Sequence, residues 1–239
     1  MSRWWKAAVV VISVVSVALW GVGFLAFRPV EPAESAGPAA RPAPSPAPTP
    51  APSPLPVFAV GDRVRLRLPV SSPVAVAFHE ASYRDAVGLR PLGSCRVCRN
   101  RWKYAPPPPR DRSLSYIVMD TRGRSQPATS AVDVVVPRWS DILAPVDGVV
   151  RRVKRYRLYG RYRDIRVELR PDGVRRRRLV MLHLSHVRLR RGDRVEASVT
   201  RIGRARRLPF ESQVDRYMRG RYPHVHVEVK RPAARRRSA

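Results

Sequence analysis

The segment from His224 to Val229 alternates polar and apolar residues strictly, and this pattern predicts a β-strand. Side chains on a strand alternate between its two faces, so we expect the three valines to enter a core. His224, His226 and Glu228 then share the other face. Two neighbouring imidazoles can hold a metal ion and move protons near neutral pH, because neutral imidazole is a good ligand for zinc. The alternative is that both histidines are ordinary residues of an exposed strand face.

Short β-type runs separated by Gly, Pro and Asp turns recur from residue 58 onward, and they predict an antiparallel all-β fold. The clearest hairpin turn is Pro171-Asp172-Gly173, and the one plausible helix is short, near Glu211 to Arg219. The expected strands are Arg63–Leu68, Val74–Phe78, Ser115–Met119, Ala131–Val136, Gly148–Val153, Tyr162–Leu169, Arg178–His183, Val199–Ile202 and His224–Val229.

The first 28 residues predict a membrane anchor. The run from Ala7 to Phe27 carries no charge, and at 1.5 Å per residue a helix of this length spans about 30 Å, the thickness of a bilayer core. Arg3 and Lys6 before it favour a cytoplasmic N-terminus, so the rest of the chain should be extracytoplasmic. A cleaved signal peptide is the alternative, but its apolar region is usually shorter. We therefore expect a single-pass protein of the cell membrane.

Residues 29–57 are mostly Pro, Ala and Ser, a composition that cannot form a packed core. Such linkers are extended at about 3.1 Å per residue, so this one could hold a domain roughly 80 Å from the membrane. We expect a stalk, followed by an N-terminal β extension at 58–114, a main β domain at 115–231 and a basic tail at 232–239.

The formal net charge of +29 would suit a polyanionic partner. Nearly all the basic residues are Arg, however, which together with the Ala and Pro content can reflect G+C-rich coding. No zinc-finger spacing or aromatic RNA-binding signature accompanies the charge, so no nucleic acid is expected as a partner. The Arg-rich hairpin from Tyr156 to Arg178 could contact an anionic polymer or phosphates, or it could be a solvated strand face.

Cys95 and Cys98 are the only cysteines, so a four-thiolate zinc site is excluded. Outside the membrane we expect them to form a disulfide within a loop. Free thiols and a redox role are the alternatives.

Six motifs in order resemble those of the lysostaphin-like zinc endopeptidases, which cut peptide cross-links in bacterial cell walls. They lie between about Ser115 and Arg231, roughly half of the chain. The motifs are Asp133-Val-Val-Val-Pro137, Ala144-Pro-Val-Asp-Gly-Val-Val150, His183-Leu-Ser185, Arg191-Gly-Asp-Arg-Val195, Ile202-Gly203 and His224-Val-His226.

The resemblance implies that Asp133 and His226 are zinc ligands and that His183 and His224 polarise the attacking water and stabilise the oxyanion. The family's first ligand is a His four residues before the Asp, and that position is Thr129 here. A neutral hydroxyl is a poor zinc ligand, so Asp133 and His226 alone fall short of the usual three.

Three interpretations follow. The first is a degenerate domain, a pseudoenzyme that binds peptidoglycan or regulates another envelope hydrolase and does no zinc-dependent hydrolysis. The second is an active metalloendopeptidase whose third ligand is His183, His79 or His186. The third is a biotinyl or lipoyl carrier, which the stretches 144–150 and 192–195 also resemble, although no Lys stands in a suitable hairpin tip.

Overall fold

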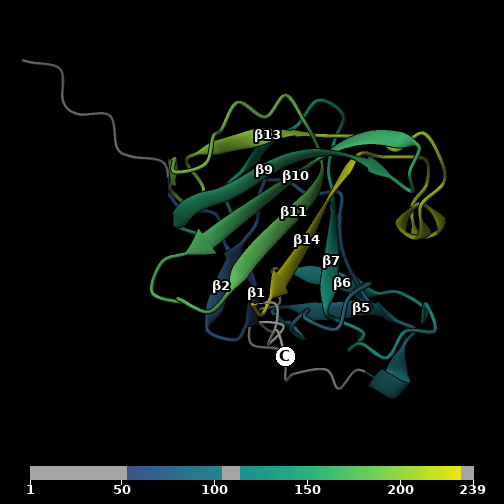
Figure 1. The fold of residues 1–239 in the computed structure, drawn as a ribbon. Helices are drawn as coiled ribbons and strands as arrows, with labels where there is room; N and C mark the ends of the chain where they lie inside the picture. Colours follow the sequence, from purple (N-terminus) through teal and green to yellow (C-terminus); the bar gives the residue numbers. More distant parts are fainter. Residues whose placement is uncertain (1–52, 104–113, 233–239) are drawn as a thin grey trace, which may run out of the picture. The chain divides into compact units, whose positions relative to one another are not determined.

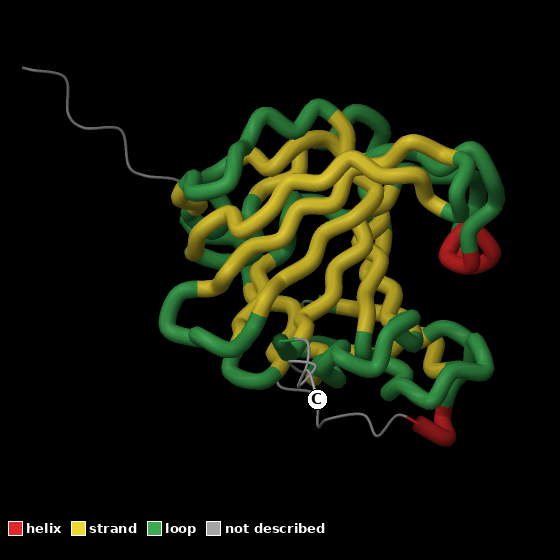
Figure 2. Tube along the Cα trace, in the orientation of Figure 1, coloured by secondary structure: helices red, strands yellow, loops and turns green. Residues whose placement is uncertain are grey.

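The computed structural model describes residues 53–103 and 114–232. Within these ranges the fold is all-β, as predicted, and the two helical segments are single short 3₁₀ turns (Figures 1 and 2). The strands are β1 (Val57–Gly61), β2 (Val64–Arg67), β3 (Ala75–His79), β4 (Arg90–Pro91), β5 (Ser94–Cys98), β6 (Ser115–Val118), β7 (Ala131–Val135), β8 (Asp141–Leu143), β9 (Gly148–Leu158), β10 (Tyr162–Pro171), β11 (Arg178–Ser185), β12 (Arg194–Val195), β13 (Arg201–Ala205) and β14 (His224–Lys230). The 3₁₀ helices are η1 (Arg101–Lys103) and η2 (Gln213–Tyr217).

The expected anchor at 1–28, nearly all of the stalk and nearly all of the basic tail lie outside the described residues. In the part of the chain that the structure covers, no helix has the length and apolar character needed to cross a membrane.

Most strands belong to one large sheet, in the order β12-β9-β10-β11-β14-β7-β3-β6-β5, with β13 and β8 joined to it through β11 (Figure 1). The pairs from β12 to β7 and β3 are antiparallel. The pairs β3–β6 and β6–β5 are parallel, which departs from the expected antiparallel pattern. The chain between β3 and β6 passes through β4, β5 and η1, and a parallel pair requires such a long crossover.

The segment 58–114, expected as an extension, contributes β3 and β5 to the same large sheet as β7 and β14. Its remaining strands β1, β2 and β4 form a separate three-stranded sheet. The boundary near Ser115 therefore falls inside one sheet, between strands that pair with each other.

Strand β14 lies between β11 and β7. Its three valines are buried and pack in one core cluster with Phe58 and Leu66 of the small sheet, as the alternation predicts. The polar face is also buried, with His224 only 2% exposed and Glu228 only 4% exposed. The idea that the two histidines are ordinary surface residues is therefore wrong, since buried polar groups require partners.

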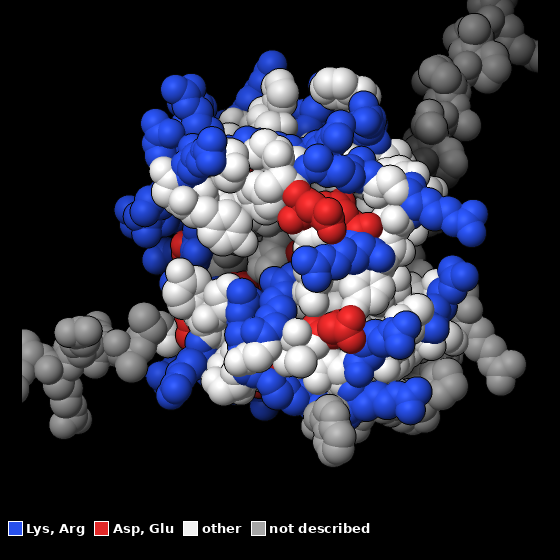
Figure 3. All heavy atoms as spheres, turned by 90° about the vertical axis from the view of Figure 1, so that its right-hand side faces the viewer, with Lys and Arg blue, Asp and Glu red and all other residues white. Residues whose placement is uncertain are grey.

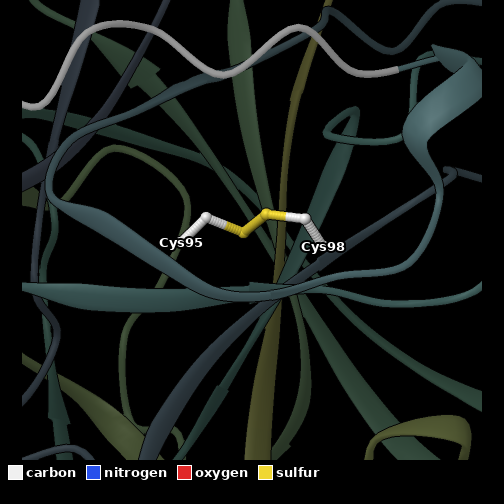
Figure 4. The surroundings of a disulfide bond; sticks show 2 residues. All are labelled: Cys95 and Cys98. Atoms are coloured by element: carbon white, nitrogen blue, oxygen red, sulfur yellow. A yellow bond between two sulfur atoms is a disulfide. The ribbon is translucent and has the colours of Figure 1, made fainter.

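Cys95 and Cys98 are bonded to each other in the structure, with their Cα atoms 6.2 Å apart (Figure 4). They were expected in a loop, but they stand on β5, the strand at the end of the large sheet, which pairs with β6.

Candidate metal centre

Three adjacent strands bring His79, Asp133 and His226 together. In the register of the sheet, Asp133 of β7 lies opposite Ala77 of β3 on one side and opposite His226 of β14 on the other. His79 is two residues beyond Ala77, so its side chain shares the face of Asp133. One potential ligand atom from each of the three residues lies within 4.8 Å of the other two, as a single metal ion would require.

The hydrogen bonds of His79 indicate that this site is suited to a cation. Its Nδ1 lies 2.9 Å from the carbonyl oxygen of Glu80, which can only accept, so Nδ1 carries the proton. Burial lowers the pKa of His79, which keeps the ring neutral. Its Nε2 therefore presents a lone pair to Asp133 Oδ1, 3.2 Å away, and none of the described residues donates a hydrogen bond to this buried nitrogen. Two facing acceptors are unfavourable, and a metal ion between them removes the conflict.

Glu228 supports the ligand His226 from behind. His226 Nδ1 lies 2.8 Å from Asp133 Oδ1, and its Nε2 lies 3.0 Å from Glu228 Oε1. Burial lowers the pKa of His226, but hydrogen bonds to the two carboxylates outweigh burial and raise it to about 9. Without a metal, His226 holds a proton between two carboxylates. A carboxylate on the far nitrogen is also the usual partner of a metal-bound His, because it fixes the ring.

Glu80 fixes the backbone next to His79. Burial raises the pKa of its carboxyl, but hydrogen bonds from Lys103, Thr121 and other donors outweigh burial and lower the pKa to about 2. The carboxylate accepts hydrogen bonds from the side chains of Asn100, Lys103 and Thr121 and from the backbone N–H groups of Arg122 and Arg124. These bonds hold the segment 121–124 against β3, beside the metal cluster.

A second arrangement positions His183 of β11. Asp164 Oδ2 accepts a hydrogen bond from His183 Nδ1 at 2.9 Å and another from the Tyr156 hydroxyl at 2.8 Å. Burial raises the pKa of Asp164, but the hydrogen bond with His183 and further interactions bring it below its usual value. His183 also has a positive φ of 64°, an uncommon conformation for a residue other than Gly. The ring is therefore fixed with Nδ1 as donor and Nε2 left for another group.

His224 completes this half of the site. Its ring centroid lies 5.1 Å from that of His183, and burial lowers its pKa to about 4. His224 is therefore neutral at neutral pH, although it stands only two residues from His226 on the same face of β14.

Asp133, His183, His224 and His226 line one cavity of about 840 Å³ together with Glu228. The face of the molecule drawn in Figure 3 is hollowed near its centre, and Lys and Arg side chains form much of the surrounding surface. Several of the residues lining the cavity are basic. They are Arg122, Arg124, Lys154, Arg157 and Arg166.

The structure thus brings the four residues of the resemblance together but not the third ligand at position 129. Thr129 is buried, and its hydroxyl donates a 2.6 Å hydrogen bond to the carbonyl oxygen of Leu89. Of the three alternative ligands, His79 joins the cluster, whereas His183 is engaged with Asp164 and His186 is exposed and lies beside Ser185. Asp164, Glu80 and Arg122 were not singled out from the sequence, because no local pattern connects them to the motifs.

No protein-family model and no curated protein matches the chain. Among solved structures, LytU is 21% identical over 44% of this chain and 62% of its own, with a TM-score of 0.34. Lysostaphin in solution is 20% identical over 44% of this chain and 37% of its own, with a TM-score of 0.33. A catalytic-domain variant of the prophage-encoded protein EnpA from Enterococcus faecalis is 19% identical over 48% of this chain and 76% of its own, with a TM-score of 0.34.

The matched region thus spans less than two thirds of LytU and of lysostaphin. All three TM-scores lie below 0.5. Lysostaphin, whose family the six motifs resemble, is among these structures.

Proposed function

We propose that this protein is a zinc-dependent endopeptidase that cleaves peptide cross-links of peptidoglycan, with His79, Asp133 and His226 as the metal ligands. The observation that carries the proposal is the entry of His79 into the cluster, since it supplies the third ligand that the sequence lacks at Thr129. Two imidazoles and one carboxylate are a donor set that catalytic zinc sites use, with a further position left for water. The active interpretation is therefore favoured over the degenerate one.

A bound zinc ion would supply a Lewis acid and a water of lowered pKa. His183 is built to take a proton, because Asp164 accepts from its Nδ1 and leaves Nε2 with a free lone pair. Asp164 also stabilises the imidazolium that forms, and Tyr156 orients Asp164 by donating to it. His224 is neutral at working pH and can donate a hydrogen bond to the developing oxyanion.

The proposed location is the outer side of the cell membrane. The uncharged run from Ala7 to Phe27 supports a single-pass anchor, and the Pro-rich stretch 29–57 supports a stalk that carries the enzyme to the wall. Peptidoglycan is the proposed partner, because the substrate of such a peptidase lies within reach of the stalk.

A second candidate is a wall-binding or regulatory domain that holds no metal. One observation favours it: a protonated His226 between Asp133 and Glu228 satisfies both carboxylates without an ion. In this case the cavity would bind peptidoglycan or support another envelope hydrolase without cleaving a bond.

Titration of the full-length protein in detergent with zinc, followed by calorimetry, distinguishes the zinc endopeptidase from the metal-free domain. We expect one zinc per chain in the natural protein and at least about a 100-fold weaker affinity after His79→Ala or His226→Ala, since each removes one of three ligands. Thr129→Val is the matched control and should leave zinc affinity within about twofold. Release of cross-link peptides from purified walls should follow zinc occupancy. An empty natural protein, or zinc retained by His79→Ala, would contradict the proposal.

A further inference from the structure

Arg122 lies beside the metal cluster, yet none of the motifs includes it. It lines the same cavity as Asp133, His224 and His226, and one of its terminal nitrogens is 3.9 Å from Asp133 Oδ2. This separation is too long for a hydrogen bond. The guanidinium is therefore close to Asp133 without being hydrogen-bonded to it.

The side chain of Arg122 is held in place. Its Nε donates to the side-chain oxygen of Gln213, and Gln213 Nε2 donates in turn to the carbonyl oxygen of Asp120 at 2.9 Å. The backbone N–H of Arg122 donates to Glu80 at 3.0 Å. The side chain is 24% exposed, so its terminal nitrogens are fixed where a ligand in the cavity can reach them. A donor fixed in advance loses little entropy when it binds.

With a metal ion bound, the net charge around the cluster is positive and favours the binding of an anion. Asp133 contributes one negative charge, and Glu228 is balanced by Lys230, 2.9 Å away. With a divalent ion in place, the ion and Arg122 together exceed the charge of Asp133, and their mutual repulsion is relieved by an anionic group between them. The further basic residues of the cavity act in the same direction.

We propose that Arg122 binds a carboxylate of the substrate, on the residue next to the scissile bond. A planar guanidinium matches a carboxylate through two parallel hydrogen bonds. Consecutive Cα atoms are about 3.8 Å apart, so a carboxylate much further along the peptide would pass beyond a guanidinium that lies this close to a metal ligand. The inference rests on the proposed peptidase function, and it adds the class of peptide that the site prefers.

The carboxylate has two possible sources, the free C-terminus of a peptide or an acidic side chain. Three matched peptides distinguish them: one that ends in a free carboxylate beside the scissile bond, its C-terminal amide, and an amide with an acidic side chain at that residue. The zinc-loaded full-length protein is assayed for hydrolysis of each peptide. Equilibrium binding of each peptide is measured separately, with and without zinc.

We expect the natural protein to favour one of the two carboxylate peptides over the plain amide by about 10- to 100-fold in kcat/KM and in affinity. Arg122→Gln should abolish this preference while leaving zinc affinity within about threefold, and Arg122→Lys should retain part of it. Arg170→Gln, an exposed residue of β10 outside the cavity, is the control and should change nothing.

An equal loss on all three peptides, or a loss of zinc binding in Arg122→Gln, would show that Arg122 only positions Asp133 and would overturn the inference. The binding measurement separates this result from failure of the proposed function. A protein that cleaves nothing but binds carboxylate peptides through Arg122 would retain the binding assignment and refute the peptidase. Hydrolysis without any carboxylate preference would support the peptidase and refute the assignment of Arg122 as the group that binds a carboxylate.

Discussion

The chain carries charge in two very different regions, the buried metal cluster with its neighbours and the exposed arginines of β9. In the cluster and beside it each carboxylate has more than one partner, and Glu80, next to the ligand His79, accepts five hydrogen bonds. On β9, by contrast, Arg151, Arg152 and Arg155 are exposed to solvent. Charges in water interact weakly and are screened by salt, whereas buried charges persist only where partners fix them. The few buried charges therefore say more about function than the large surface excess.

The largest effect should come from breaking the buried network at Glu80. Glu80→Ala leaves Lys103 and two backbone N–H groups without the carboxylate that accepts from them, and we expect the free energy of unfolding to fall by about 3–5 kcal/mol. Urea denaturation measures the change. Glu211→Ala is the control, because Glu211 pairs with Arg216 on the surface and its replacement should cost less than about 0.5 kcal/mol. Equal effects of the two substitutions would contradict the contrast between buried and exposed charges.

Glu228→Gln should weaken zinc binding by about 10- to 100-fold, or roughly 1.4–2.8 kcal/mol, because Glu228 orients the ligand His226. Competition with a chromophoric chelator measures the affinity. The variant keeps all three ligands, so unchanged binding would mean that the carboxylate serves only to pair with Lys230.

Asp164→Asn tests a buried charge in the other half of the site by its pH dependence. The pKa of Asp164 is lower in the folded protein than its usual value near 3.8, so its ionised form stabilises the fold above that pH. This contribution is lost as the pH falls through the folded-state pKa. We expect the variant to be less stable by about 1–2 kcal/mol at pH 7.

The difference between Asp164→Asn and the natural protein should shrink steadily below about pH 4, where urea unfolding can follow it. Tyr156→Phe removes only one neutral donor to Asp164, so its cost should vary less with pH. A difference between Asp164→Asn and the natural protein that stays constant from pH 7 to pH 3 would contradict the assignment.

The smallest effect is expected on the exposed hairpin. Arg152→Gln should change the free energy of unfolding by less than about 0.5 kcal/mol, since the side chain is exposed. If the hairpin contacts anionic wall polymers, the variant should bind purified walls more weakly at low salt, and the difference should shrink as the salt concentration rises, because salt screens exposed charges. A difference that persists at high salt would point to a specific contact instead.

The sequence by itself predicted the all-β fold and the inward valines of β14, because strand periodicity is a local property. Asp133, His183, His224 and His226 were singled out through the resemblance of the ordered motifs. Only the tertiary structure decided that the polar face of β14 is buried and that His79 joins the metal cluster. His79 and Asp133 are far apart in the chain and meet because β3 pairs with β7 in one register. Strand partners and register are set by packing across the whole sheet, and a shift of one residue would turn His79 to the other face. The pairing of β10 with β11 places Asp164 behind His183, and the hydrogen bond from the backbone of Arg122 to Glu80 holds Arg122 beside Asp133.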